Sequence, residues 1–170
     1  GGKCLGMAVL AQAIKMAADK AKAPGISLVT TSNTPNSTGY LGWYAKQLAN
    51  NNLIGIVLAQ SPEFVAPYNA YQPIFGTNPI AVSVPDSGDS NPVTLDMATS
   101  AYALFGLLEA KTAGKSIPDN VAYDSEGQPT TDPSEALAGA IRVFDRSHKS
   151  SGLALMVELL AGGLSGSAIE

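Results

Sequence analysis

The spacing of apolar residues along the chain predicts alternating helices and strands. Apolar side chains recur on one helical face from Gly6 to Lys22, and Pro24 with Gly25 ends that helix. The next pattern predicts a strand, a helix and a buried strand, at 26–31, about 39–51 and 53–59. This order is typical of a βαβ unit, in which a helix covers two parallel strands.

The rest of the chain continues the alternation. The pattern predicts further strands within 75–85, 93–96 and 141–144, and helices at about 100–113, 134–139 and 153–164. Thr99 or Ser100 is expected to cap the first of these helices, and Asp132 or Ser134 the second. Between them, 117–133 is rich in Pro, Asp, Gly and Thr, which favours a surface loop. The fold class is therefore α/β.

Composition narrows the class of protein. With 170 residues and 45% hydrophobic residues, we expect one compact unit over 1–170. Low charge and 17 glycines suggest close packing on more partners than the chain provides, so we expect a piece of a larger fold. The net charge of −4 and the lack of a basic cluster argue against nucleic acid as a partner.

The apolar runs and the cysteine content indicate the compartment. The longest apolar runs, 53–59 and 153–160, are shorter than a membrane crossing. The single Cys4 cannot form an intrachain disulfide, and the first residues do not resemble a secretory signal. We therefore expect a cytoplasmic protein with no membrane partner.

Candidate chemistry gathers between Gln60 and Ser100, where polar turns adjoin apolar strands. Thr77 and Asn78 lie at the mouth of one strand, and Asp96 ends the next. Such a carboxylate accepts hydrogen bonds from sugar hydroxyls, and free amides at the following helix start would face an anion. A carboxylate beside a helix start with no ligand is the alternative.

The remaining candidates lie outside that stretch. Lys149 could meet an anion as a point charge, although a solvated surface lysine is more common. His148 is the only histidine, the usual proton carrier near neutral pH, although most lone histidines are structural or exposed. Ser37 and Ser61 offer hydroxyls but lack an evident base. No metal site is expected, because one cysteine and one histidine do not make a tetrahedral set.

Five ordered motifs then resemble those of the type-2 malate/L-lactate dehydrogenase family, which includes ureidoglycolate dehydrogenase and diketogulonate reductase. They are NSTGYLGWYAKQLANNNLIGI, AQSPEFVAPYNAYQPIFGTNPIAVSVP, VTLDMATS, IPDNVAYDSEGQPTTDP and HKSSGLALMVELLAGGLSG. The resemblance implies a homodimeric NAD- or NADP-dependent oxidoreductase that interconverts 2-hydroxy acids and 2-oxo acids. It also implies a mixed sheet flanked by helices, in a dinucleotide-binding core unrelated to the Rossmann domain.

The resemblance also assigns roles to residues. It implies that the dinucleotide is bound by Ser61, Asp96, Met97, Ala98 and Lys149, with Thr77 and Asn78 lining the same pocket. Ser37 stands where many family members have a histidine thought to handle the proton, and serine cannot replace imidazole as a base near pH 7. His148 and Ser37 are thus the catalytic candidates. The alternative is a non-catalytic or truncated homologue that binds cofactor or partner without turnover.

Overall fold

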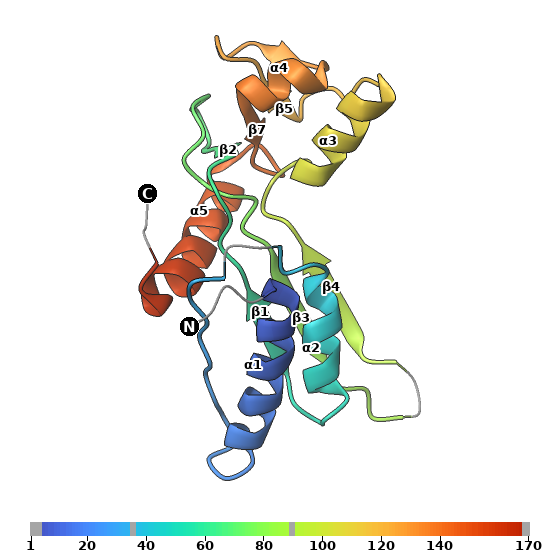
Figure 1. Ribbon diagram of the computed structural model, residues 1–170, viewed down its shortest axis with the longest axis vertical. Helices are drawn as coiled ribbons and strands as arrows, with labels where there is room; N and C mark the ends of the chain where they lie inside the picture. The colour runs from blue at the N-terminus through green and yellow to red at the C-terminus, as the bar shows by residue number, and fades with distance from the viewer. Residues whose placement is uncertain (1–4, 35–36, 89–90, 168–170) are drawn as a thin grey trace. The chain divides into compact units, whose positions relative to one another are not determined.

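The computed structural model describes residues 5–34, 37–88 and 91–167, so Cys4 lies outside the described residues. The chain forms two compact units (Figure 1). The first unit contains Gly1–Ala59, Ile80–Met97 and Leu160–Ala168, and the second contains Gln60–Pro79, Ala98–Leu159 and Ile169–Glu170. The described chain passes between units after Ala59, Pro79, Met97 and Leu159.

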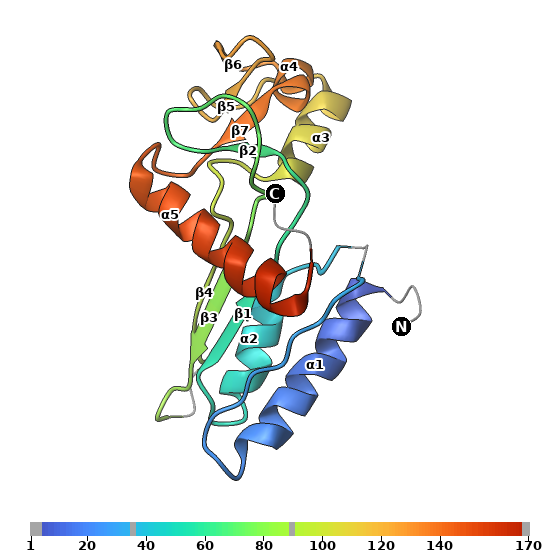
Figure 2. The same cartoon turned by 90° about the vertical axis from the view of Figure 1, so that its left-hand side faces the viewer.

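The first unit is a small sheet covered by two helices. Its helices are α1 (Gly6–Ala21) and α2 (Leu41–Ala49), and its strands are β1 (Gly55–Leu58), β3 (Ile80–Val84) and β4 (Val93–Met97). The strand order is β1-β3-β4, and both neighbouring pairs are antiparallel. Helix α2 lies against all three strands and α1 packs on α2 (Figure 2).

The two faces of this sheet differ in burial. On the α2 side, Ala81 packs in a core with Leu41, Tyr44 and Ala45. Gly55 lies on the same side, where a Cβ would come within 2.7 Å of the Ala45 carbonyl oxygen, so only glycine allows this close approach. The other face carries the apolar row Ile56, Val82 and Leu95.

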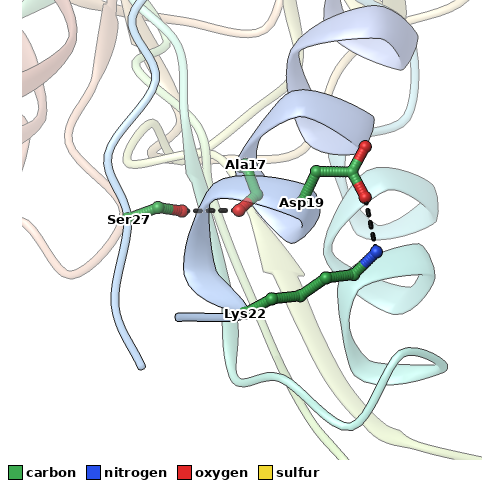
Figure 3. A network of polar contacts seen from close by, with 4 residues as sticks. All are labelled: Ala17, Asp19, Lys22 and Ser27. Carbon is green, nitrogen blue, oxygen red and sulfur yellow. Dashed lines mark hydrogen bonds and ion pairs between the residues drawn. The ribbon is translucent and has the colours of Figure 1, made fainter. Parts of the chain in front are cut away.

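The expected strand at 26–31 is wrong, and with it the parallel βαβ unit. These residues form no ladder with any strand in the described ranges, and Ile26 and Leu28 are 79% and 74% exposed. The segment is instead attached to α1 through Ser27, whose hydroxyl donates to the Ala17 carbonyl at 2.7 Å (Figure 3). The apolar pattern at 26–31 suits a strand, but β1 takes β3 as its neighbour, in the antiparallel sense.

The second unit contains a four-stranded sheet with short strands and three helices. In chain order its elements are β2 (Val65–Ala66), α3 (Leu104–Ala113), β5 (Ala122–Tyr123), β6 (Pro129–Thr130), α4 (Pro133–Ala138), β7 (Ala140–Arg142) and α5 (His148–Val157). The strand order is β2-β7-β5-β6, with β2 and β7 parallel and the other pairs antiparallel. The predicted α/β class with a mixed sheet is confirmed.

Of the two helix caps predicted in the second unit, one is confirmed and one is wrong. Asp132 caps α4 as predicted, since its carboxylate accepts from the amides of Ser134 and Glu135 at 2.7 and 3.2 Å. The expected cap of α3 is wrong. That helix begins later, after Ala103, which makes no side-chain cap hydrogen bond.

Two other segments differ from expectation. Residues 117–133 form more than a surface loop, because β5 and β6 pair within them. The last helix begins at His148, where the sequence predicted Leu153, because Ser147 caps it through a hydrogen bond from the Lys149 amide. A π-helix then follows at Glu158–Gly162 and a short 3-10 helix at Gly163–Ser165. No helix of the described residues has both the length and the apolarity to cross a membrane.

Candidate functional site

Three candidates of the second unit meet in one hydrogen-bonded cluster. The Ser61 hydroxyl accepts from the Thr77 amide at 2.8 Å and lies 3.1 Å from the Thr77 hydroxyl. The Ser61 amide donates to Oδ1 of Asn78 at 3.3 Å. These contacts join the loop after β1 to the GTNP turn before β3, so the two hydroxyls are held as a pair. Both residues are half-buried.

Asn78 is the centre of this cluster. It is fully buried and has a φ of +37°, in the left-handed region that few residues other than glycine adopt. Its side-chain amide donates to Oε2 of Glu158 at 2.6 Å and to the Ala154 carbonyl at 3.3 Å. The Thr99 hydroxyl donates to the Asn78 carbonyl at 3.1 Å. The turn is therefore fixed from both its side chain and its backbone.

Glu158 is a site residue that the sequence reasoning missed. Its side chain is 2% exposed, and besides Asn78 it accepts from the side-chain amide of Gln60. Glu158 is not among the site residues expected from the sequence. A usable signal was present, because Glu158 is the single charged residue in the otherwise apolar run 153–162.

Gly76 explains why the GTNP turn can approach Ser61 so closely. A Cβ at this position would lie 2.2 Å from the Ser61 carbonyl oxygen and 2.4 Å from its hydroxyl. Such an overlap could be relieved only if the backbone of the turn or of Ser61 moved. Glycine is thus required for the contact between the two loops.

The start of α5 carries Lys149 and a strongly acidic carboxyl. Asp145 accepts from the Ser147 amide at 2.8 Å, from the Ser147 hydroxyl at 2.6 Å and from the Ser150 hydroxyl. The Ser147 hydroxyl, followed by that of Ser150, lowers the pKa of Asp145 to about 2. Lys149 is exposed in the first turn of the helix, and its ammonium forms no ion pair within the described ranges. A cationic group is therefore available to an anion beside this helix start.

His148 lies at the first position of α5 and is exposed. Its ring makes an edge contact with the Tyr68 ring, with centroids 6.5 Å apart. Among the described residues no hydrogen bond orients its ring nitrogens, whereas a catalytic imidazole is commonly oriented by a partner.

Asp96 and Ser37 belong to the first unit, and each has a local partner. Asp96 Oδ2 accepts from the Gly42 amide at 2.6 Å. The carboxylate thus provides an acceptor for one of the amides in the first turn of α2, which have no acceptor within the helix. The Ser37 hydroxyl accepts from the Gly39 amide at 3.2 Å. The structure therefore gives both side chains a role in turns and helix ends.

The residues after Asp96 do not form the expected helix start. Met97 ends β4 and Ala98 is half-buried. The Thr99 amide donates to the Thr77 carbonyl at 2.9 Å, and Ser100 bridges to Val143. The expectation that free helical amides follow Asp96 is wrong, because α3 begins only at Leu104.

The structure thus brings Ser61, Thr77 and Asn78 together, and Lys149 belongs to the same unit. Asp96 and Met97 belong to the first unit, as does Ser37. The cluster is a hydroxyl-rich, glycine-containing pair of loops, whose chemistry suits a polar ligand with hydroxyls or an anionic group.

The chain matches a family of dehydrogenases over its whole length. The chain belongs to the malate/L-lactate dehydrogenase family, whose profile matches residues 1–170. It is 44% identical over 168 residues to L-sulfolactate dehydrogenase of Methanothermobacter thermautotrophicus, covering 99% of this chain and 48% of that protein. It is 36% identical to the NADP(+)-dependent (2R)-3-sulfolactate dehydrogenase of Chromohalobacter salexigens, covering 96% and 48%.

A solved structure agrees with these sequence relatives. The crystal structure of Δ1-piperideine-2-carboxylate reductase from Pseudomonas syringae superposes with a TM-score of 0.86 at 35% identity, covering 94% of this chain and 48% of that one. The chain therefore spans about half the length of the relatives that it matches. The family resemblance read from the five motifs is confirmed.

Proposed function

We propose that this chain carries the dinucleotide-binding core of an NAD(P)-dependent oxidoreductase that interconverts a 2-hydroxy acid and its 2-oxo acid. The observation that carries the proposal is the family match over all 170 residues. Two relatives are named for sulfolactate, a 2-hydroxy acid of the malate and lactate type. The bound nicotinamide would supply the hydride chemistry, and the protein would bind and orient the reactants.

The cluster of the second unit has donors that fit a dinucleotide. Ser61 and Thr77 share one hydrogen bond between their hydroxyls, so one hydroxyl proton of the pair is left to donate to a ligand. Asn78 lies behind them and fixes the turn. Lys149 would attract a phosphate as an exposed point charge.

We also propose, from the family resemblance, that Asp96, Met97 and Ala98 bind the cofactor. Asp96 uses Oδ2 for the Gly42 amide, which leaves Oδ1 without a hydrogen bond among the residues that the structure describes. An ionised carboxylate accepts from ribose hydroxyls, so Oδ1 is the atom that we assign to this contact. Either NAD or NADP is compatible with these residues, and one relative is named for NADP(+).

The proton-transfer step has two candidates, Ser37 and His148. Ser37 can bind a substrate oxygen through its hydroxyl but cannot serve as a base near pH 7. His148 carries an imidazole, the usual proton carrier in catalysis, but it is exposed and not oriented by a hydrogen bond within the described ranges. These observations favour a second proposal, a homologue that binds the cofactor without turnover.

A cofactor titration separates the proposals. NADH and NADPH fluorescence would be followed on addition of protein. Turnover would be measured with sulfolactate, malate and lactate in the presence of NAD⁺ or NADP⁺, and with Δ1-piperideine-2-carboxylate in the presence of NADH or NADPH. Binding with turnover supports the first proposal, and binding without turnover supports the second. If neither dinucleotide binds, both proposals fail.

Lys149→Ala tests the role of the cation. We expect dinucleotide binding to weaken by about tenfold or more, because a charge-assisted hydrogen bond contributes roughly 1.5–3 kcal/mol and each 1.4 kcal/mol is tenfold in affinity. Lys115→Ala is the matched control, since Lys115 is an exposed lysine of the same unit. Equal affinity in both variants would remove Lys149 from the site.

We also propose that the protein acts as a homodimer in the cytoplasm, as the resemblance and the single cysteine suggest. Exposed apolar side chains such as Val93 and Ile56, at 74% and 61% exposure, are compatible with association. Sedimentation velocity over a concentration series would test this, and a monomer at all concentrations would contradict it.

A further inference from the structure

We propose that Glu158 is a positioning residue for the dinucleotide site, which holds the Gln60–Ser61 loop against the Gly76–Asn78 turn. The inference deepens the proposed function and rests on it. Glu158 touches neither Ser61 nor Thr77 itself. It acts through Asn78 and Gln60, which belong to the two segments that carry those hydroxyls.

The buried side chain of Glu158 is stabilised by hydrogen bonds to two other segments. Its side chain is 2% exposed at the end of α5, and within the described ranges it pairs with no lysine or arginine. A buried carboxylate is destabilising unless hydrogen bonds replace its water. Here two neutral amides do so, one on each oxygen: Gln60 donates to Oε1 and Asn78 to Oε2. The carboxylate thus joins two loops that are separated in sequence.

Hydrogen bonds connect Glu158, through Asn78, to the hydroxyls of Ser61 and Thr77. The same Asn78 side chain that donates to Glu158 accepts from the Ser61 amide through Oδ1. The Ser61 hydroxyl in turn accepts from the Thr77 amide at 2.8 Å. A chain of three hydrogen bonds therefore runs from Glu158 to the hydroxyl pair.

The backbone and side chain of Asn78 are both fixed in the turn. Its φ of +37° lies in the left-handed region, which asparagine adopts more readily than most non-glycine residues. The Glu158 carboxylate and the Ala154 carbonyl, both from α5 or its end, supply the two acceptors that fix the side chain. The π-helix that begins at Glu158 is a form often found at functional sites.

Only a carboxylate satisfies both amides at once. A glutamine at 158 would keep the shape but offer one oxygen and one NH₂ group. In the side-chain orientations that the structure shows, its NH₂ would face the NH₂ of either Gln60 or Asn78, so one of the two hydrogen bonds would be lost. Glu158→Gln is therefore a local test of the connection, with little change in volume.

The experiment compares Glu158→Gln with Glu135→Gln in the full 170-residue chain. Glu135 is a matched control because it also accepts a side-chain hydrogen bond in the second unit, from the Thr130 hydroxyl at 2.5 Å. Amide hydrogen exchange is measured at Ser61 and Thr77, and at Ile141, whose amide donates to the Phe64 carbonyl in the same unit. NADH and NADPH affinities are measured in parallel.

We expect Glu158→Gln to lower protection at Ser61 and Thr77 by about tenfold, leave Ile141 unchanged and weaken dinucleotide binding by about tenfold. A merely structural role would lower protection at all three amides together, and that result overturns the proposal. Unchanged protection at Ser61 and Thr77 overturns it too. Local loss of protection with unchanged affinity overturns the assignment to the cofactor site.

Failure of the proposed function is distinguishable. If the unsubstituted chain binds neither dinucleotide, the proposed function fails and the link to a cofactor fails with it, while the exchange data still decide whether Glu158 holds the two loops. If Glu158→Gln does not fold, Glu158→Asp is used, because it keeps the charge but is one methylene too short to reach both amides. It is expected to give the same local loss of protection.

Discussion

At the scale of single residues, Asp145 makes the stability of the protein depend on pH. Hydrogen bonds from Ser147 and Ser150 lower the pKa of this exposed carboxyl from 3.8 to about 2. A lowered pKa means that the ionised form is favoured in the folded state. The stabilisation is therefore complete above pH 3.8 and is lost as the pH falls through about 2.

Asp145→Asn tests this sign. We expect the variant to be less stable than the unsubstituted chain above about pH 4, and the two to converge near pH 2, because asparagine does not titrate in this range. Urea unfolding midpoints from pH 2 to 6 would show the convergence. A constant difference at all pH values would mean that Asp145 acts through packing and not through its charge.

Residue types and local order predicted part of the site. Ser61, Thr77 and Asn78 stand beside strand ends, where backbone geometry gathers polar groups, and the structure joins them. Glu158 was missed because its partners are about 80 and 98 positions away in sequence. Asp96 was expected to end its strand and lies one residue before that end, but its hydrogen bond to α2 depends on a tertiary contact that no local pattern encodes.

At the scale of elements, Gly76 sets how closely the two loops of the second unit approach. We expect Gly76→Ala to destabilise the protein by about 2 kcal/mol or more, because its Cβ would overlap the Ser61 carbonyl and the backbone would have to move. Thermal or urea unfolding measures the effect.

Gly152→Ala is the control for this prediction. Gly152 lies inside α5, and a Cβ there meets no atom within 4 Å. Alanine is the better helix former, so this variant should gain about 0.5–1 kcal/mol. If Gly76→Ala were as well tolerated as Gly152→Ala, the close contact at Ser61 would be refuted.

The elements that were predicted correctly are those whose sequence pattern is local. The amphipathic pattern of α1 and the Asp132 cap of α4 are local, and both are confirmed. The segment 26–31 has strand-like residues, but a strand exists only when a partner is beside it, and the partner is chosen by the whole fold. For the same reason the sequence could not show that β1 pairs with β3 in the antiparallel sense.

At the scale of the whole molecule, the first unit exposes apolar surface on one sheet face. Leu95 is 52% exposed and is paired through the register with Val82, which is opposite Ile56. We expect Leu95→Thr to raise the concentration at which the protein stays monodisperse, with a stability change within about 0.5 kcal/mol. Light scattering and urea unfolding would be measured together, and a large loss of stability would show that the side chain is buried in solution.

The repeated passage of the chain between its two units limits how the protein can be dissected. Each unit draws on separated stretches, with changes after Ala59, Pro79, Met97 and Leu159. Removing residues 1–59 would leave β3 and β4 of the first unit attached to the second, and any boundary between β2 and α5 would remove strands or helices from both units. Neither half can be prepared by trimming an end, so isolating one would require rejoining its pieces with new linkers.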